Sequence, residues 1–282
     1  MKEILVSRQN PTVKRICSLT EKKNRRREGL FRFDGMKLLE EAARGGLSLV
    51  YVVLRMPMEA KTEERVRTLM EEGVLDESVL LPVSESVFEK MTEEKSPEGI
   101  LCVAKLPDEL HRSLAPEEPE ETLCPGEKLL ILESVRDPGN LGTVLRSADA
   151  LGIDRLILTE DCADLYHPRT VRAAMGALFR LPTLTVPTEA LPCYIERLRT
   201  TGRRLYAAAL HTDALTVGEF PLYKGDGLVI GNEGHGLSEA VIAACDRAAV
   251  IPMREGAESL NAAAAAAICI WETVRAGKGE GQ

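Results

Sequence analysis

Short apolar runs alternate with segments of helical periodicity throughout the second half of the chain. The runs predict strands at Leu129–Leu132, Leu156–Leu158, Leu184–Val186, Leu205–Leu210, Leu228–Ile230 and Ala249–Ile251. The patterns between them predict helices at Gly142–Leu151, Val171–Phe179, Leu191–Thr200, Ser238–Cys245 and Asn261–Ala276. Because strands that are apolar throughout are typical of parallel sheets buried on both faces, we expect an α/β domain over residues 128–282.

The first hundred residues predict a second, smaller α/β domain. Apolar and β-branched runs indicate strands at Ser48–Leu54 and Gly99–Ala104, and a short extended stretch at Leu30–Phe33. Thr62–Glu72 has its apolar residues at helical spacing. We expect this domain to span residues 1–106.

An acidic linker is expected between the two domains, at residues 107–127. This stretch holds four prolines, seven acidic residues and one basic residue, Arg112, with no apolar periodicity. Such a composition favours an extended, solvated chain, which would let the first domain move relative to the second.

Charge is distributed unevenly along the chain. The net charge of −8 argues against a protein that coats nucleic acid indiscriminately, because such binding depends on lysine and arginine contacts to phosphate. Residues 1–37 nevertheless hold eleven Lys or Arg against four Asp or Glu. The densest run provides the candidate RNA-binding residues Lys22, Lys23, Arg25, Arg26 and Arg27. A solvated helix face is an equally good interpretation of that run.

Neither a metal site nor a membrane segment is expected. The seven cysteines are scattered and never two residues apart, and the four histidines show no ligand spacing. No apolar run approaches the length that spans a bilayer, and the N-terminus lacks the pattern of a signal peptide. We expect a cytoplasmic protein with reduced thiols.

Three loops after predicted strands have unusual compositions, and strand ends of this kind are where parallel sheets bind ligands. In the first loop, a tight turn at Asp137–Asn140 feeds a helix, so Asn140 lies near the helix N-terminus and Arg146 almost two turns further on. These could be a helix cap and a surface arginine. The apolar neighbours of Arg146 suggest instead an anionic partner, for which RNA phosphate is one candidate.

The other two loops are rich in small residues. Gly231–Ser238 has three glycines within six positions, which permits close backbone approach to a ligand but is a weak signal alone. Arg254–Asn261 precedes the alanine run Ala262–Ala267, and its Ser259 or Asn261 is expected to cap the last helix.

Together and in this order, the three loops resemble the signature motifs of the SpoU (TrmH-like) family of RNA 2′-O-ribose methyltransferases, within the SPOUT superfamily. The first domain, with Arg25–Phe31 leading into Asp34–Ala42, resembles the substrate-binding domain that many members carry in front. The resemblance implies a C-terminal trefoil knot, an S-adenosylmethionine cofactor bound in that knot, and a homodimer formed through the C-terminal domain. It also implies an RNA substrate.

Matched to these motifs, the site residues fall into two groups. The resemblance implies the cofactor-binding residues Gly231, Ile251 and Leu260, with their neighbours Asn232 and Met253. It implies the catalytic residues Asn140, Arg146, Glu233, Ser259 and Asn261. Two positions depart from the pattern: only alanines follow Asn261, where small polar residues are usual, and Asp34 stands where relatives commonly carry Glu.

The expected function is S-adenosylmethionine-dependent 2′-O-ribose methylation of structured RNA, with ribosomal RNA favoured by the added N-terminal domain. Because a guanidinium is a poor base at neutral pH, Arg146 is expected to orient a phosphate and stabilise negative charge, and a phosphate oxygen or water to take the proton. Methylation of transfer RNA, and a non-catalytic RNA-binding or ribosome-assembly protein, are the alternatives. A nucleotide-dependent oxidoreductase ranks lower because GxGxxG is absent.

Overall fold

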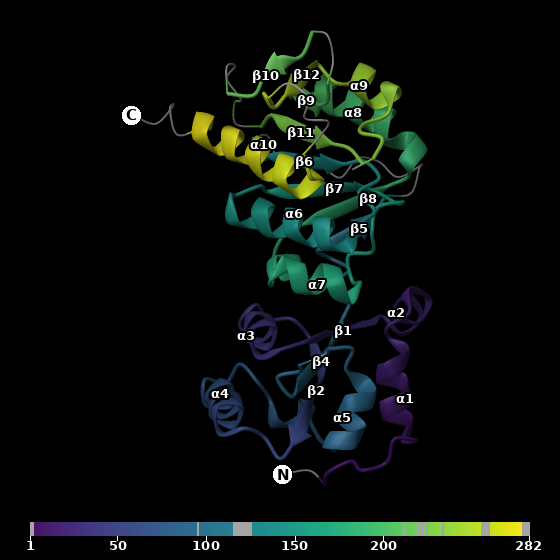
Figure 1. Ribbon diagram of the computed structural model, residues 1–282, viewed down its shortest axis with the longest axis vertical. Helices are drawn as coiled ribbons and strands as arrows, with labels where there is room; N and C mark the ends of the chain where they lie inside the picture. The colour runs from purple at the N-terminus through teal and green to yellow at the C-terminus, as the bar shows by residue number, and fades with distance from the viewer. Residues whose placement is uncertain are drawn as a thin grey trace. The chain divides into compact units, whose positions relative to one another are not determined.

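The computed structural model describes residues 3–94, 96–114, 126–210, 213–218, 223, 225–232, 234–254 and 260–277 (Figure 1). It divides into two compact units. The first comprises Met1–Pro107 together with Tyr166–Phe179, and the second comprises Asp108–Leu165 together with Arg180–Gln282.

The first unit is built on a four-stranded mixed sheet in the order β1-β4-β2-β3. Its strands are β1 (Leu30–Asp34), β2 (Leu49–Met56), β3 (Leu80–Ser84) and β4 (Ile100–Lys105). Its helices are α1 (Pro11–Ser18), α2 (Lys22–Glu28), α3 (Met36–Arg44), α4 (Ala60–Glu71), the short η1 (Glu77–Val79) and α5 (Glu85–Met91). Apolar residues of α1 and α5 share one buried core with β1 to β4.

A segment from the second half of the sequence completes the first unit. It contains α7 (Pro168–Ala174) and η2 (Ala177–Phe179). Rings from this segment pack on β1: the Tyr166 centroid lies 4.9 Å from that of Phe31, and the Phe179 centroid lies 5.3 Å from that of Phe33. Arg172 of α7 forms an ion pair with Glu94.

The second unit contains an eight-stranded sheet in the order β10-β12-β9-β11-β6-β7-β8-β5, in which every described pair is parallel. The strands are β5 (His111–Ser113), β6 (Leu129–Leu132), β7 (Arg155–Thr159), β8 (Thr183–Val186), β9 (Leu205–Ala208), β10 (Leu215–Thr216), β11 (Gly227–Ile230) and β12 (Arg247–Val250). Apolar strands of this kind require cover on both faces.

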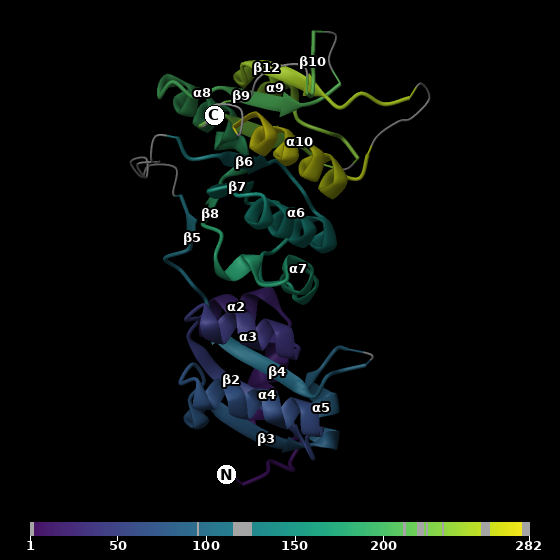
Figure 2. The same cartoon turned by 90° about the vertical axis from the view of Figure 1, so that its left-hand side faces the viewer.

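Helices provide that cover. They are α6 (Pro138–Ala150), the short η3 (Thr188–Ala190), α8 (Leu191–Thr200), α9 (Glu239–Ala244) and α10 (Ala262–Gly277). Figures 1 and 2 show α6 and α10 side by side on one face of the sheet, with α8 and α9 on the other. The core on the second face joins Leu129 and Ile131 of β6 to Tyr194 and Ile195 of α8 and to Val241 of α9.

The predicted α/β class with a mainly parallel sheet is confirmed, and each strand predicted in the second unit is present within a few residues. The pattern missed β3, α5 and the two-residue β10. Within the stretch expected to be a linker, His111–Ser113 form β5, whose partner is β8. None of the described helices is long and apolar enough to cross a membrane.

The basic run forms α2, but its side chains do not share one environment. Arg25 is 3% exposed, and its Nη1 donates to the carbonyls of Leu19 at 2.8 Å and Thr20 at 2.6 Å. It therefore fastens α2 to the end of α1 and is not presented to a ligand. Arg26 and Arg27 are exposed, and so are Lys22 and Lys23.

Replacing Arg25 with methionine should therefore destabilise the first unit by about 2–3 kcal/mol, because two carbonyls lose a charged donor inside the protein. Arg26→Met is the matched control, since the neighbouring side chain is exposed, and should change stability by less than about 0.5 kcal/mol. Urea denaturation of the full chain measures both. Equal stability of the two variants would contradict the structural role of Arg25.

Candidate functional site

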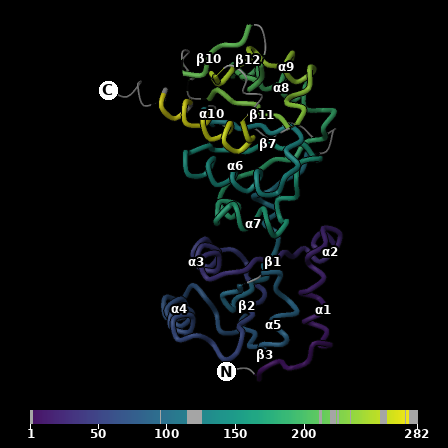
Figure 3. Tube along the Cα trace, in the orientation of Figure 1, coloured from purple at the N-terminus to yellow at the C-terminus, as the bar shows by residue number. Residues whose placement is uncertain are grey.

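The first loop begins a helix at the carboxyl end of β6. The Asp137 side chain caps α6 by accepting from the backbone N–H of Asn140 at 2.9 Å, and Pro138 occupies the first helical turn, where its missing N–H costs nothing. This places Asn140 in the first turn, as the sequence predicts. The trace in Figure 3 shows α6 continuing beside α10.

A hydrogen bond between two asparagines joins the first and third loops. The Asn261 Nδ2 donates to the Asn140 Oδ1 at 2.9 Å, although the residues are 121 positions apart. The Asn261 Oδ1 accepts from the backbone N–H groups of Ala263 at 3.0 Å and Ala264 at 3.3 Å, so this residue also caps α10. Of the two residues predicted as the cap, Ser259 and Asn261, the structure shows Asn261 in this role, and two predicted catalytic residues are in contact.

An apolar cavity of about 120 Å³ opens beside this pair of loops. Three of the predicted cofactor-binding residues line it: Ile251, Met253 and Leu260. Mostly small residues complete the wall: Ala208 at the end of β9, Ala209 and Leu210 after it, Ala249 and Val250 of β12, and Ala265 of α10. A flat apolar group fits such a lining, because small side chains leave the backbone close to whatever occupies the space.

The glycine loop after β11 is closed on itself. Asn232 and Gly236 exchange backbone hydrogen bonds, both 3.0 Å long, and the Asn232 Oδ1 accepts from the N–H groups of Gly234 at 2.8 Å and His235 at 3.2 Å. A Cβ on Gly231 would lie 2.3 Å from the Gly236 carbonyl carbon, so only glycine fits there. Gly231 and Asn232 lie in this loop and not in the wall of the cavity.

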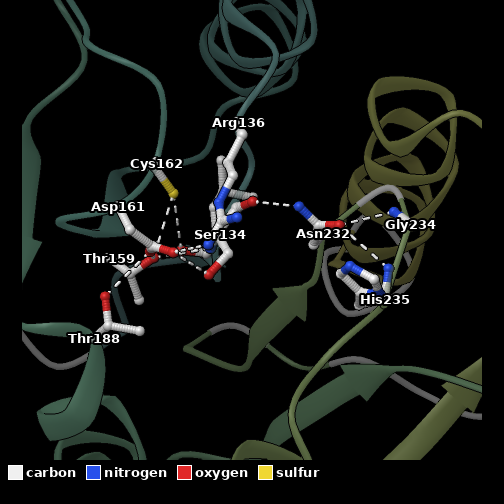
Figure 4. Close-up of polar contacts among 10 residues, drawn as sticks. Ser134, Arg136, Thr159, Asp161, Cys162, Thr188, Asn232, Gly234 and His235 are labelled. Carbon is white, nitrogen blue, oxygen red and sulfur yellow. Dashed lines mark hydrogen bonds and ion pairs between the residues drawn. The ribbon is translucent and has the colours of Figure 1, made fainter.

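A carboxylate network ties the first loop to the end of β7 (Figure 4). The Asp161 carboxylate accepts from Ser134 Oγ at 2.6 Å, Thr159 Oγ1 at 2.7 Å, Arg136 Nη2 at 2.9 Å and Thr188 Oγ1 at 3.1 Å. Burial alone would raise the pKa of Asp161, but the donors Ser134, Thr159, Arg136 and Thr188 outweigh it and lower that pKa to about 2. The carboxylate therefore stays charged at neutral pH.

A second carboxylate, from Glu133, ties the first loop to the second. Glu133 is 6% exposed, and its Oε2 accepts from the backbone N–H of Ser238 at 2.8 Å. Ser238 itself caps α9 by accepting from the N–H of Val241 at 3.3 Å. The loops after β6 and β11 are thus joined at the start of α9 as well.

Arg146 points outward from α6. Its apolar neighbours Val144, Leu145 and Ala148 are fully buried, whereas Arg146 is exposed and makes no ion pair with any described residue. The apolar residues occupy the inward faces of the helix and leave Arg146 on the outward one, so no described residue is the expected anionic partner, and RNA phosphate stays the predicted candidate.

Two of the predicted catalytic residues, Glu233 and Ser259, lie outside the described residues. Asp161 and Glu133 were missed by sequence reasoning, although the rule that ligands gather at strand ends applies to β7 as it does to β6. Within the described part of the chain, the His, Cys, Asp and Glu side chains form no cluster of three or more that could hold a metal ion.

The parallel sheet, the apolar cavity at its carboxyl edge and the asparagine pair beside it define a ligand-binding α/β protein with an added N-terminal unit. Two family models match these parts: the SpoU rRNA methylase family at residues 127–271, and an MRM3-like substrate-binding domain at residues 10–102. The chain belongs to the SpoU rRNA methylase family, which confirms the resemblance of its motifs.

Known proteins resemble the whole chain. The 23S rRNA (guanosine(2553)-2′-O)-methyltransferase RlmP of Bacillus subtilis is 34% identical over 271 residues, covering 96% of this chain and 98% of that one. An AdoMet-bound rRNA methyltransferase from Sinorhizobium meliloti superimposes with a TM-score of 0.80 at 30% identity, covering 97% of both chains. The SpoU methyltransferase AviRb from Streptomyces viridochromogenes, in complex with AdoMet, has a TM-score of 0.78 at 28% identity, covering 95% of this chain and 98% of that one.

Replacing Gly231 with alanine should lower the melting temperature of the second unit by about 6 °C or more, because its Cβ would collide with the Gly236 backbone. Gly234→Ala is the matched control: the nearest atom to its Cβ would be the Asn232 Oδ1, at 3.5 Å. Thermal unfolding followed by circular dichroism separates the two, and identical melting temperatures for both variants would contradict the close approach.

Proposed function

We propose that this protein transfers a methyl group from S-adenosylmethionine to a ribose 2′-hydroxyl of ribosomal RNA. The observation that carries the proposal is the convergence of Asn140, Asn261 and the apolar cavity at one edge of the sheet. It is supported by the family of the chain and by the full-length relative named as a 23S rRNA 2′-O-methyltransferase.

The residues around the cavity suit this cofactor. Ile251, Met253 and Leu260 offer an apolar wall to the adenine ring and the methionine side chain, and alanines allow the backbone to reach polar atoms of the ligand. The two similar structures that contain AdoMet support this assignment. We assign Gly231 and Asn232 to the same site, although neither lines the cavity, because β11 pairs in parallel with β9 and its loop leaves the sheet at the same edge.

The cofactor supplies a methyl group made electrophilic by the positive charge on its sulfur. The protein residues supply placement and charge. We propose that Asn140 and Asn261 position the ribose, that Arg146 binds the adjacent phosphate and stabilises negative charge on the 2′-oxygen, and that a phosphate oxygen or water accepts the proton. Glu233 and Ser259 remain candidate catalytic residues.

The exposed cations of α2 are proposed to bind RNA phosphates. These are Lys22, Lys23, Arg26 and Arg27, while Arg25 holds α2 in place. The match of residues 10–102 to a substrate-binding domain supports this role. Transfer RNA is the second candidate substrate, and an inactive RNA-binding protein the third. The retained Asn140, Arg146 and Asn261 favour an active enzyme. An RNA-modifying enzyme of this kind would work in the cytoplasm.

Replacing Arg146 with alanine should reduce methyl transfer to ribosomal RNA by at least about 100-fold, because charge on the 2′-oxygen loses its stabilising cation. Transfer of label from methyl-tritiated S-adenosylmethionine measures the rate, and calorimetric titration with the cofactor should give an unchanged Kd. Arg197→Ala, on the exposed side of α8, is the control and should leave both unchanged. Equal losses of binding and turnover in the Arg146 variant would assign that residue to the cofactor instead.

We propose that the second unit forms the trefoil knot implied by the family, and that it dimerises through α10. The support for the dimer is a pair of exposed apolar side chains on α10: Ile268 is 39% and Trp271 is 49% exposed. These side chains lie three residues apart and therefore on one face of the helix. Large exposed apolar groups of this kind usually mark an interface.

Trp271→Glu should convert a dimer into a monomer, raising the dissociation constant by at least about 100-fold, because a buried carboxylate would lack a partner. Val6→Glu, at a 70% exposed position of the first unit, is the control and should leave the mass unchanged. Sedimentation equilibrium reports the masses. A dimer that persists in the Trp271 variant would exclude this face of α10.

A further inference from the structure

Ser134 adopts a backbone conformation that its residue type disfavours. Its φ is +57°, in the left-handed region that glycine enters freely and serine rarely does. Two bonds hold it there: its N–H donates to the Thr159 Oγ1 at 2.8 Å, and its Oγ donates to the Asp161 Oδ2 at 2.6 Å. Thr159 is the last residue of β7 and Asp161 follows it by two positions, so the end of this strand determines the shape of the first loop.

The conformation of Ser134 determines where its carbonyl points. That carbonyl accepts from the Asn232 Nδ2 at 2.8 Å. The Oδ1 of the same Asn232 side chain accepts from the N–H groups of Gly234 and His235. Figure 4 shows these contacts as one continuous chain from Asp161 through Ser134 to the glycine loop. Asp161 has no hydrogen bond to the described residues of that loop, so its influence on them passes through Ser134.

Asp161 is not available for chemistry of its own. An ionised carboxylate offers about four acceptor positions, and Asp161 receives four donors, from Ser134, Arg136, Thr159 and Thr188. Its lowered pKa agrees with a carboxylate that is held charged and is a poor base. A group so engaged can act only through the residues that it holds.

We propose that Asp161 is a positioning residue for methyl transfer, which fixes the glycine loop after β11 against the loop that begins α6 by holding Ser134 in its left-handed conformation. The proposal rests on the proposed function, since the two loops are those assigned to cofactor and ribose. It adds the end of β7 to the site. This strand end would hold the loop after β6 and the loop after β11 in a fixed position relative to each other.

The first test is Asp161→Asn, which keeps the shape of the side chain but places an NH₂ group among donors. Hydrogen exchange of the protein without ligands should show at least tenfold faster exchange at Gly234, His235 and Gly236. With ribosomal RNA and saturating cofactor, the single-turnover rate should fall 10- to 100-fold. Asp154→Asn is the matched control, because Asp154 accepts from the Lys128 N–H at the opposite end of β7; it should change neither measurement.

The second test is rescue by glycine. Ser134→Gly reaches a φ of +57° without strain. Adding it to the Asp161→Asn variant should therefore raise the single-turnover rate at least fivefold above that of Asp161→Asn alone, and should slow the hydrogen exchange at Gly234. A role limited to overall stability would change the melting temperature without this rescue. Wild-type exchange and turnover in Asp161→Asn would overturn the proposal. An inactive wild-type protein would instead refute the proposed function, and the exchange rates would still decide whether Asp161 holds the loops.

Discussion

The parallel pairing of β6 with β7 on one side and β11 on the other is the constraint on which the site depends. The registers Leu132 with Leu158 and Leu132 with Ile230 bring the ends of all three strands within one residue of the same level. Because parallel strands leave their sheet in one direction, the chain must form three loops at this edge before it returns through helices on either face. The site residues in the loops after β6, β7 and β11 follow from that geometry, whereas Ile251, Met253 and Leu260 follow β12, which pairs with β9.

Beyond the last ladder bonds, side chains hold the loops together. Glu133 joins the first loop to the start of α9, Asp161 joins it to the end of β7, and Asn261 joins it to α10. The first two of these links are hydrogen bonds to ionised groups, which are shorter and stronger than neutral ones. These bonds join the loops at this edge of the sheet to one another.

The fold class and most strands could be predicted from the sequence, because apolar runs such as Leu129–Leu132 and Leu228–Ile230 indicate buried strands by their residue types alone. The sequence also named Ser259 or Asn261 as the cap of the last helix, since a cap is local, and the structure has Asn261 in that role. The carboxylate Asp161 could not be found in this way: its importance depends on Ser134 having a positive φ, which residue type alone argues against. Arg25 was misplaced for a related reason, because a basic run does not reveal which member faces inward.

The most direct test of the account is the position of the methyl group in the product. Ribosomal RNA labelled from methyl-tritiated S-adenosylmethionine by this protein would be hydrolysed with alkali, which requires a free 2′-hydroxyl at the cleaved position. The account predicts label in alkali-resistant dinucleotides, since a 2′-O-methylated ribose blocks cleavage. Label in mononucleotides would mean methylation of a base and would contradict the assignment of ribose chemistry to this site.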